Sequence, residues 1–209
     1  MSLNYWDNLY SFQADWDWSQ PSYDDWLEKH REMWQNAKNV IDLGCGAGVN
    51  SVYLHAQGIQ TIACDFSENA LKRVKAVLPG AQTLCFDMTD GLPFTDAFTG
   101  LVIADLSLHY FTKATTMHIL DDIRRILLPK GHLICRVNAM REFEENERPQ
   151  ENTQIEPHLY FENRKGTKRF FDRNDIDTFF GGWSVQYIAE TTIYKYGATK
   201  YAWEVCVEK

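Results

Sequence analysis

The 209-residue chain lacks the features that mark membrane, secreted and zinc-binding proteins. It contains no run of about 18 apolar residues, so no membrane-spanning helix is expected. Its N-terminus has no basic segment followed by an apolar one, which argues against a secretory signal. The five cysteines include no Cys-x-x-Cys pair, and the six histidines are scattered, so no metal site is expected. Unpaired cysteines of this kind are typical of the reducing cytoplasm.

Positive charge is also scarce. The sequence has 21 lysines and arginines against 29 aspartates and glutamates, for a net charge of −8. Phosphate backbones would repel such a chain unless it carried a local basic patch. The one basic cluster, "NRKGTKRFF" over 163–171 with Arg164, Lys165, Lys168 and Arg169, is interpreted as a solvated turn between two strands. We therefore do not expect a nucleic-acid partner.

What the sequence does contain, from residue 38 onward, is an alternation of apolar runs with amphipathic stretches. This alternation predicts parallel strands joined by helices, that is, a doubly wound α/β fold. Sheets of this kind bind ligands at the carboxyl ends of their strands, near the switch in strand order. The expected strands are 39–44, 59–65, 82–87, 100–106 and 132–138, and the expected helices are 49–57, 68–78 and 113–128. Ser67 is expected to cap the second of these helices.

Two segments fall outside this alternation. The first 37 residues hold five of the seven tryptophans, Trp6, Trp16, Trp18, Trp26 and Trp34. We interpret this segment as a helical cap packed over the sheet, with a mobile lid over a ligand as the alternative.

Residues 139–160 are predicted to form a long acidic loop, whose Glu144 and Glu145 could shape an acceptor pocket. The tail predicts a helix over 174–180 and strands over 183–190 and 200–208. The expected organisation is one domain over 1–209, with a cap (1–37), a core (38–138) and a tail (139–209).

The stretch "VIDLGCGAGVN" (40–50) places three glycines directly after a predicted strand. Glycines permit a close backbone approach to a ligand. A dinucleotide fingerprint would need its third glycine one residue later, and a phosphate-binding P-loop would need a lysine, which is absent here. A polyphosphate ligand is therefore not expected. Asp42, beside the turn, would repel a pyrophosphate but could hold a cationic amino group.

Two further carboxylates follow the next two predicted strands. Asp65, in "ACDFSENAL", could accept hydrogen bonds from both hydroxyls of a ribose, and Phe66 could lie against an adenine ring. Asp87, in "CFDMTD", could accept from the adenine amino group, with Met88 as an apolar neighbour and Asp90 as a competing candidate. The three carboxylates together indicate a nucleoside that carries a cationic amino-acid end.

These motifs, "VIDLGCGAG", "ACDFSENAL" and "CFDMTDGLPF", resemble those of the class I S-adenosylmethionine-dependent methyltransferases. The tail is similar to small-molecule members, including the tellurite-resistance-like group. The resemblance implies a Rossmann-like seven-stranded sheet, mostly parallel with an antiparallel C-terminal strand, and S-adenosylmethionine as cofactor. It also implies that the glycine turn contacts the methionine end of the cofactor, Asp65 the ribose and Asp87 the adenine. The candidate cofactor residues are Asp42, Leu43, Gly44, Cys45, Gly46, Asp65, Phe66, Asp87, Met88 and Leu106.

The resemblance specifies the acceptor poorly. "ADLSLHYF" (104–111) replaces the Asn/Asp-Pro-Pro-Tyr/Phe motif of many enzymes that methylate bases or protein amides, and the negative charge disfavours RNA. A small-molecule or metalloid acceptor is therefore expected, with Asp105, His109 and Tyr110 as candidates for a base. The alternatives are a nicotinamide-dependent oxidoreductase and a non-catalytic module that binds the cofactor. The chain is expected to be a monomer or homodimer with no membrane partner.

Overall fold

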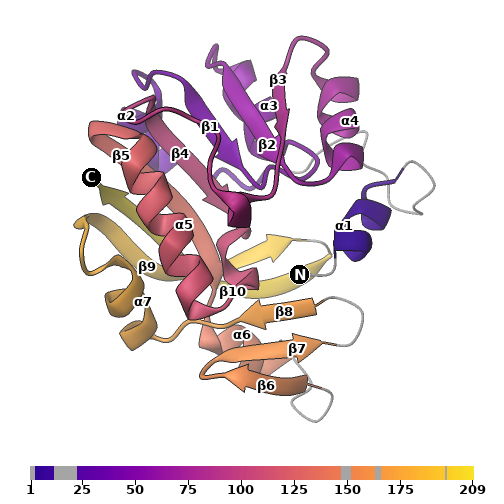
Figure 1. Ribbon diagram of the computed structural model, residues 1–209, viewed down its shortest axis with the longest axis vertical. Helices are drawn as coiled ribbons and strands as arrows, with labels where there is room; N and C mark the ends of the chain where they lie inside the picture. The colour runs from indigo at the N-terminus through magenta and orange to yellow at the C-terminus, as the bar shows by residue number, and fades with distance from the viewer. Residues whose placement is uncertain (1–2, 12–22, 147–151, 163–165, 196) are drawn as a thin grey trace.

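The computed structural model describes residues 3–11, 23–146, 152–162, 166–195 and 197–209. A twisted sheet runs through the molecule with helices on both of its faces (Figure 1). This sheet has seven strands in the order β3-β2-β1-β4-β5-β10-β9. The strands are β1 (Val40–Leu43), β2 (Thr61–Asp65), β3 (Gln82–Cys85), β4 (Thr99–Asp105), β5 (Leu127–Asn138), β9 (Ser184–Lys195) and β10 (Ala198–Glu208).

The strand pairing confirms the predicted fold class. Strands β3, β2, β1, β4 and β5 pair in parallel, whereas β10 pairs antiparallel with both β5 and β9. The chain moves outward from β1 through β2 to β3 and then returns to place β4 on the other side of β1. The switch in strand order therefore lies between β1 and β4, where doubly wound sheets place their ligands.

The two faces of the sheet carry separate apolar layers. Helices α5 (Lys113–Ile126) and α7 (Arg173–Phe180) cover one face with the larger core, around Val102, Leu133 and Val205. The short helices η1 (Glu28–His30) and α2 (Arg31–Trp34) pack with α3 (Val49–Ala56) on the other face, around Trp26, Trp34 and Ile103. Helix α4 (Glu68–Val77) contacts β2 and β3. Because both faces are covered, the central strands are mostly apolar, and their few charged residues, such as Asp42 and Arg136, are buried.

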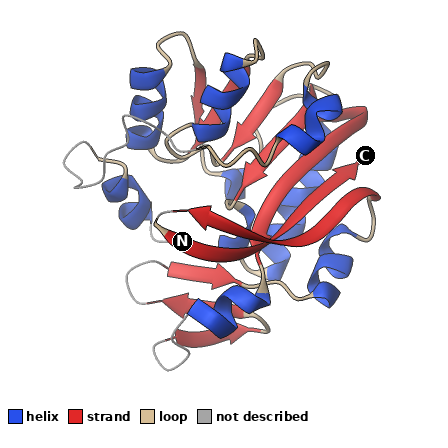
Figure 2. Cartoon of the chain, turned by 180° about the vertical axis from the view of Figure 1, so that it is seen from behind, coloured by secondary structure: helices blue, strands red, loops and turns tan. Residues whose placement is uncertain are grey.

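The prediction of a long acidic loop over 139–160 is wrong. This region forms helix α6 (Met140–Asn146) and the strands β6 (Asn152–Glu156) and β7 (Leu159–Glu162), which join β8 (Gly166–Arg169) in a second, three-stranded sheet (Figure 2). Tertiary contacts explain how such an acidic segment becomes ordered. Phe143 stacks on Tyr160 with ring centroids 4.1 Å apart. Glu142 is only 2% exposed, and it accepts hydrogen bonds from Lys200 and from the backbone N–H of Tyr201.

Two other expectations also need correction. The described part of the basic cluster is not solvated, because Arg169 is 2% exposed and forms an ion pair with Glu156. Arg164 and Lys165 lie outside the described residues.

Helix α5 ends at Ile126 rather than Leu128, and β5 starts at Leu127 rather than 132. The Pro129-Lys130-Gly131 segment therefore lies within the strand, next to a register shift in the pairing with β4. Such a shift accommodates a proline, which donates no hydrogen bond to the sheet.

Two further predictions concern membrane spans and cysteines. No helix among the described residues is long and apolar enough to cross a membrane. All five cysteines are free; four are buried, as expected for small apolar side chains, whereas Cys85 is exposed. Strand β3 forms one edge of the large sheet, which leaves Cys85 at the surface despite its apolar sequence context.

Candidate functional site

The glycine turn joins β1 to α3 at the switch in strand order. The N–H groups of Gly44 and Cys45 both donate to the carbonyl of Cys64, at 2.8 and 2.9 Å. Gly44 and Gly46 have φ angles of +71° and +53°, in the left-handed region that favours glycine. A Cβ atom added at Gly44 would lie 2.4 Å from the Cβ of Ser107. The turn therefore packs directly against the loop that follows β4, which requires a residue without a side chain.

Asp42 lies beneath this turn and is completely buried. Its Oδ2 accepts hydrogen bonds from the N–H and hydroxyl of Ser51, at 3.2 and 2.7 Å. Its Oδ1 has no partner among the described residues. Burial raises the pKa of Asp42 to about 6, against the opposing effect of the Ser51 hydrogen bonds. A buried carboxylate oxygen without a partner costs free energy, and a cationic ligand group would remove that cost.

Asp65, at the end of β2, holds the glycine turn and the start of α4 together. Its Oδ2 accepts from the N–H of Gly46 and its Oδ1 from the N–H of Ser67, each at 2.9 Å. The residue is 7% exposed, and burial raises its pKa against the effect of these two hydrogen bonds. Ser67, as predicted, is the N-cap of α4 and accepts from the N–H of Ala70. Each Asp65 oxygen has a second lone pair, so the carboxylate can still accept from a ligand hydroxyl.

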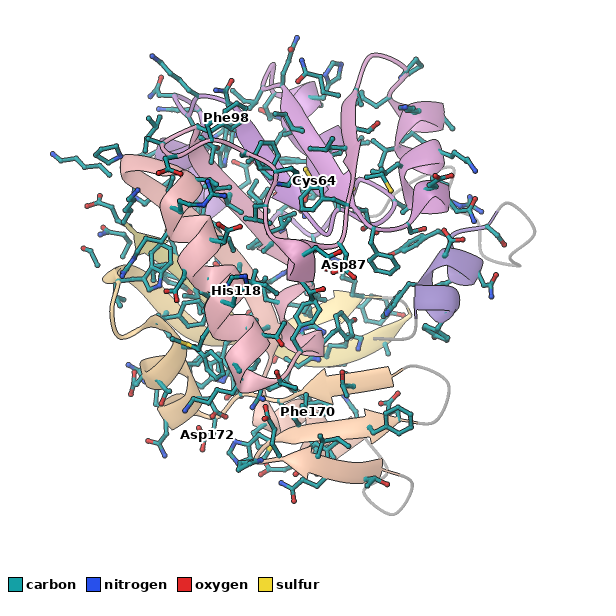
Figure 3. All side chains as sticks on the ribbon, viewed as in Figure 1. Cys64, Asp87, Phe98, His118, Phe170 and Asp172 are labelled. Carbon is teal, nitrogen blue, oxygen red and sulfur yellow. The ribbon has the colours of Figure 1, made fainter. Side chains whose placement is uncertain are left out.

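The third carboxylate, Asp87, follows β3 at the same edge of the sheet (Figure 3). Its Oδ1 accepts from the N–H and hydroxyl of Thr89, at 2.9 and 2.8 Å, and thereby caps η2 (Met88–Asp90). Asp90, the competing candidate, is exposed. Phe66 is half-buried, whereas Met88 is buried and lies close to Gly44. Leu43 and Cys45 are buried on either side of Gly44.

The loop after β4 completes the site from the other side of the switch. Leu106 has a φ of +56°, unusual for a branched side chain, and packs with Ile193 and Ala202. The hydroxyl of Ser107 donates to the carbonyl of Leu43 at 2.8 Å, which ties this loop to β1. The structure thus joins the glycine turn to Asp65 by a hydrogen bond and to the loop after β4 by close packing, with Asp42 next to the turn in the chain.

Of the three candidate bases, Asp105 is held in a buried ion network. Arg136 donates from Nε to Asp105 Oδ1 at 2.7 Å and from Nη2 to Oδ2 at 2.9 Å, and Lys195 also donates to Oδ2. Burial alone would raise the pKa of Asp105, but the charges of Arg136 and Lys195 outweigh it and hold the pKa well below its usual range. A carboxylate with so low a pKa accepts a proton poorly.

His109 and Tyr110 lie in η3 (Leu108–Tyr110), with ring centroids 4.4 Å apart. His109 is 2% exposed, and its Nδ1 has no partner among the described residues. Burial, supported by the charges of Lys168 and Lys200, lowers the pKa of His109 well below its usual value. The imidazole is therefore neutral at physiological pH. The carbonyl of Tyr110 accepts from the Thr167 hydroxyl, so the second sheet contacts this loop.

Sequence reasoning missed several residues that build this region. Arg136 is the one arginine within the apolar run "HLICRVN". An arginine in a buried strand needs a charged partner, and this requirement could have indicated the ion network. Asp24 and Lys195, its network partners, gave no local signal. Helix α1 (Leu3–Leu9) lies within the predicted helical cap, but Asp7 and the following Tyr10 were not singled out. Trp16 and Trp18, assigned to the same possible lid, lie outside the described residues.

A cluster elsewhere brings together His158, Asp172 and Asp175, whose potential ligand atoms lie within 4.8 Å of one another. Asp172 and Asp175 form the capping box of α7, and His158 Nδ1 lies 2.6 Å from Asp175 Oδ2. The N-terminal capping box and the hydrogen bond between His158 and Asp175 explain why these three side chains lie together, so no ligand is needed to explain the cluster.

Comparisons with known proteins agree with this geometry. A family model described as a methyltransferase domain matches residues 41–135. An uncharacterized methyltransferase of Synechocystis is 35% identical over 94 residues, which are 45% of this chain and 44% of that relative. The aligned part thus spans about half the length of the curated relatives, with 44% and 51% for the first two.

Solved structures show the same fold. An S-adenosylmethionine-dependent methyltransferase from Methanosarcina mazei has a TM-score of 0.73 at 13% identity, covering 90% of this chain and 99% of that one. A 1,6-didemethyltoxoflavin-N1-methyltransferase from Burkholderia thailandensis, solved with bound 1,6-didemethyltoxoflavin and S-adenosylhomocysteine, has a TM-score of 0.64 at 15% identity over 88% and 74% of the two chains. At these identities the likeness concerns the fold alone.

Proposed function

We propose that this chain is a class I S-adenosylmethionine-dependent methyltransferase, which transfers a methyl group from S-adenosylmethionine to a small-molecule acceptor. The observation that carries this proposal is the contact between the glycine turn and Asp65, with the unpartnered Oδ1 of Asp42 buried beside it. When bound, the cofactor supplies a methyl group already activated on a sulfonium. The protein must align the acceptor and exclude water.

We assign the cofactor-binding roles as follows. Asp42 faces the cationic amino group, because a buried carboxylate oxygen without a partner needs a hydrogen-bond donor. Asp65 accepts from the ribose hydroxyls through its remaining lone pairs. Two residues contact the adenine: Phe66, which follows β2, and Asp87, which follows β3. Leu43, Cys45, Met88 and Leu106 supply apolar surface around the glycine turn.

Where the acceptor arrives protonated, His109 is the candidate base outside the Asp105 ion network, but the burial that lowers its pKa makes it a weak base, so it suits an acceptor that loses its proton readily. Its neutral ring has an unpartnered Nδ1 and stands next to Tyr110. Asp105 already accepts from Arg136 and Lys195, so its role is to position the end of β4 rather than to remove a proton.

A small acceptor is supported by the net charge of −8, which disfavours RNA, and by the absence of an Asn/Asp-Pro-Pro motif. The structurally similar enzyme from Burkholderia thailandensis acts on a small molecule. We further propose that the chain acts in the cytoplasm as one catalytic unit, monomeric or homodimeric. A screen of acceptors that follows release of S-adenosylhomocysteine would identify the substrate.

Calorimetric titration of the protein with S-adenosylhomocysteine and, separately, with NAD tests the proposal. We expect saturable binding of S-adenosylhomocysteine and none of NAD. A nicotinamide-dependent oxidoreductase would give the reverse result, and that outcome would remove the methyltransferase assignment.

Replacing Asp65 by alanine is expected to weaken S-adenosylhomocysteine binding about 10- to 100-fold, or about 1.4–3 kcal/mol. The variant loses the ribose acceptor and also the hydrogen bond that holds the N–H of Gly46. Titration calorimetry measures the change, with thermal unfolding to verify that the variant is folded. Asp121→Ala, at an exposed position of α5, is the matched control and should bind normally. An Asp65→Ala variant with wild-type affinity would show that the ribose assignment is wrong.

Cofactor affinity is expected to rise as the pH increases through about 6. The pKa of Asp42 is raised to about 6 in the free protein. A bound cationic amino group favours the carboxylate, so binding releases a proton below that pH and affinity falls there by up to about tenfold per pH unit. Calorimetry in buffers of different ionisation enthalpy would detect the released proton. Asp42→Asn should flatten the profile; a wild-type profile that is already flat between about pH 5 and 7 would contradict the role of Asp42.

A further inference from the structure

Helix α1 packs against α4, and the residue that follows it reaches the glycine turn (Figure 1). Tyr10, which directly follows the helix, is 7% exposed and packs with Ala47 and Ala70. Its hydroxyl lies so close to the turn that a Cβ atom added at Gly46 would be 2.6 Å from Tyr10 Oη. Gly46 and Asp65 are both buried in this arrangement. The outer side of the proposed cofactor site is therefore covered by α1.

Polar contacts fasten α1 to α4 at two points. In the helix, the Asp7 carboxylate accepts from the Ser67 hydroxyl at 2.6 Å and from the N–H and side-chain amide of Asn69 at 3.3 and 3.0 Å. Just after the helix, Arg73 donates to the carbonyls of Tyr10 and Ser11. We call these contacts of Asp7 and Arg73 the α1–α4 latch. Ser67 also donates its N–H to Asp65, so the latch is directly connected to the proposed ribose carboxylate.

The same helix reaches the loop that holds the candidate bases. The ring of Trp6 meets that of Tyr110 edge-on, with centroids 5.3 Å apart. Trp6 Nε1 is buried and has no partner among the described residues. Indole N–H groups that are buried normally find an acceptor. The segment of α1 and Tyr10 thus contributes Tyr10 to the glycine turn and Trp6 to the loop that holds the candidate bases, and the latch holds both in place.

The free energy of the latch contacts is small enough for α1 to detach from α4 and return repeatedly. A hydrogen bond to a charged group contributes about 1.5–3 kcal/mol, and partial exposure lowers that value. Helix α1 has only seven residues, so it has little stability of its own and depends on its tertiary contacts. Loss of one side of the latch should therefore shift α1 toward an open arrangement without unfolding the sheet.

We propose that Asp7 and Arg73 are positioning residues that latch α1 over the cofactor site, where they set the rate of cofactor exchange and hold Trp6 and Tyr10 in the site. The proposal rests on the proposed function, because it takes the glycine turn and Asp65 as the place where the cofactor binds. It goes beyond that function in assigning control of exchange to two residues that lie outside the cofactor motifs.

The first test measures S-adenosylhomocysteine dissociation by stopped-flow fluorescence, using the tryptophan signal. Asp7→Ala is expected to increase the dissociation rate about tenfold, corresponding to about 1.4 kcal/mol. Asp7→Asn, which keeps the hydrogen-bond acceptor without the charge, should give an intermediate rate. Glu68→Gln is the matched control, because it removes a negative charge from the first turn of α4 at a side chain that is 76% exposed and pairs with Lys72. Its dissociation rate should equal that of the wild type.

The second test measures hydrogen exchange in the ligand-free protein, and it does not depend on the proposed function. Asp7→Ala and Arg73→Met should each raise amide exchange in residues 3–11 while leaving β1 and β4 protected. Faster exchange there together with faster dissociation supports the latch. Unchanged dissociation in an Asp7→Ala variant that still binds S-adenosylhomocysteine would overturn it. If wild-type protein failed to bind S-adenosylhomocysteine at all, the proposed function would fail, and the latch with it, whatever the exchange of residues 3–11.

Discussion

Replacing Arg136 by methionine is expected to lower the free energy of unfolding by about 3–5 kcal/mol, the range found when one partner of a buried ion pair is removed. The Arg136 side chain is 0% exposed. It donates to Asp105 and, through Nη1, to Asp24 at 2.5 Å, and its guanidinium lies 4.4 Å from the ring centroid of Trp26. The variant leaves Asp105 buried with Lys195 as its remaining partner in the network.

The loss should also reach the site. The carbonyl of Arg136 accepts from the N–H of Leu106, and Asp105 immediately precedes that residue. A displaced Asp105 would therefore move the loop that contacts the glycine turn. Urea unfolding monitored by tryptophan fluorescence gives the stability change, and a chain of this length should lose roughly 2–4 °C in Tm per kcal/mol.

Two variants sharpen the Arg136 experiment. Arg173→Met breaks an arginine–aspartate pair of α7 whose side chains are 60% and 57% exposed, and it should change stability by less than about 0.5 kcal/mol. The double variant Arg136→Met/Asp105→Asn removes two charges of the network together and should recover part of the loss. If Arg136→Met cost no more than Arg173→Met, the buried network would have no structural importance.

Replacing Gly44 by alanine is expected to cost about 2–5 kcal/mol of stability and to abolish measurable cofactor binding. The φ of +71° disfavours a residue with a Cβ atom by about 1–2 kcal/mol. The added atom would lie 2.4 Å from Ser107 Cβ, and relieving such overpacking costs about 1–3 kcal/mol more. Either the turn or the loop after β4 must then move, and both border the proposed cofactor site. Thermal unfolding and titration with S-adenosylhomocysteine measure the two effects.

Gly58 provides the matched control for Gly44. Its φ is +82°, but a Cβ atom added there would meet nothing within 4 Å. Gly58→Ala therefore isolates the backbone cost of about 1 kcal/mol and should leave cofactor binding intact. Adding Ser107→Gly to Gly44→Ala removes the opposing Cβ and should restore part of the stability. Equal losses for Gly44→Ala and Gly58→Ala would show that the contact with Ser107 is unimportant.

Local signals were enough to predict the fold class and most of the candidate site. Strands β1, β2 and β4 end at Leu43, Asp65 and Asp105, within one residue of the predicted ends, because a glycine after the first and an aspartate at the end of the other two stop the apolar run. The cap at Ser67 was predicted for the same reason, since capping depends on a side chain and a backbone only three residues apart. The carboxylates at the ends of neighbouring parallel strands then had to lie at one edge of the sheet.

The errors arose where distant contacts override local composition. The acidic segment after β5 reads as a loop, yet Glu142 is buried because Lys200 and the Tyr201 backbone, far away in sequence, satisfy its charge. Pro129 and Gly131 read as a helix stop, yet they lie inside β5, because pairing with β4 extends that strand. Composition within a short window contains no information about such partners.

By itself, therefore, the sequence determined the parallel sheet, the glycine turn and the carboxylates that follow its first strands, because each depends on residues that are neighbours in the chain. Only the tertiary structure decided how those groups are used. It closed Asp105 into a network with Arg136 and Lys195, left His109 neutral, folded the acidic segment into a second sheet and placed Tyr10, which follows α1, against Gly46. These features depend on burial and on pairing between residues far apart in the chain, and both exist only once the molecule has folded.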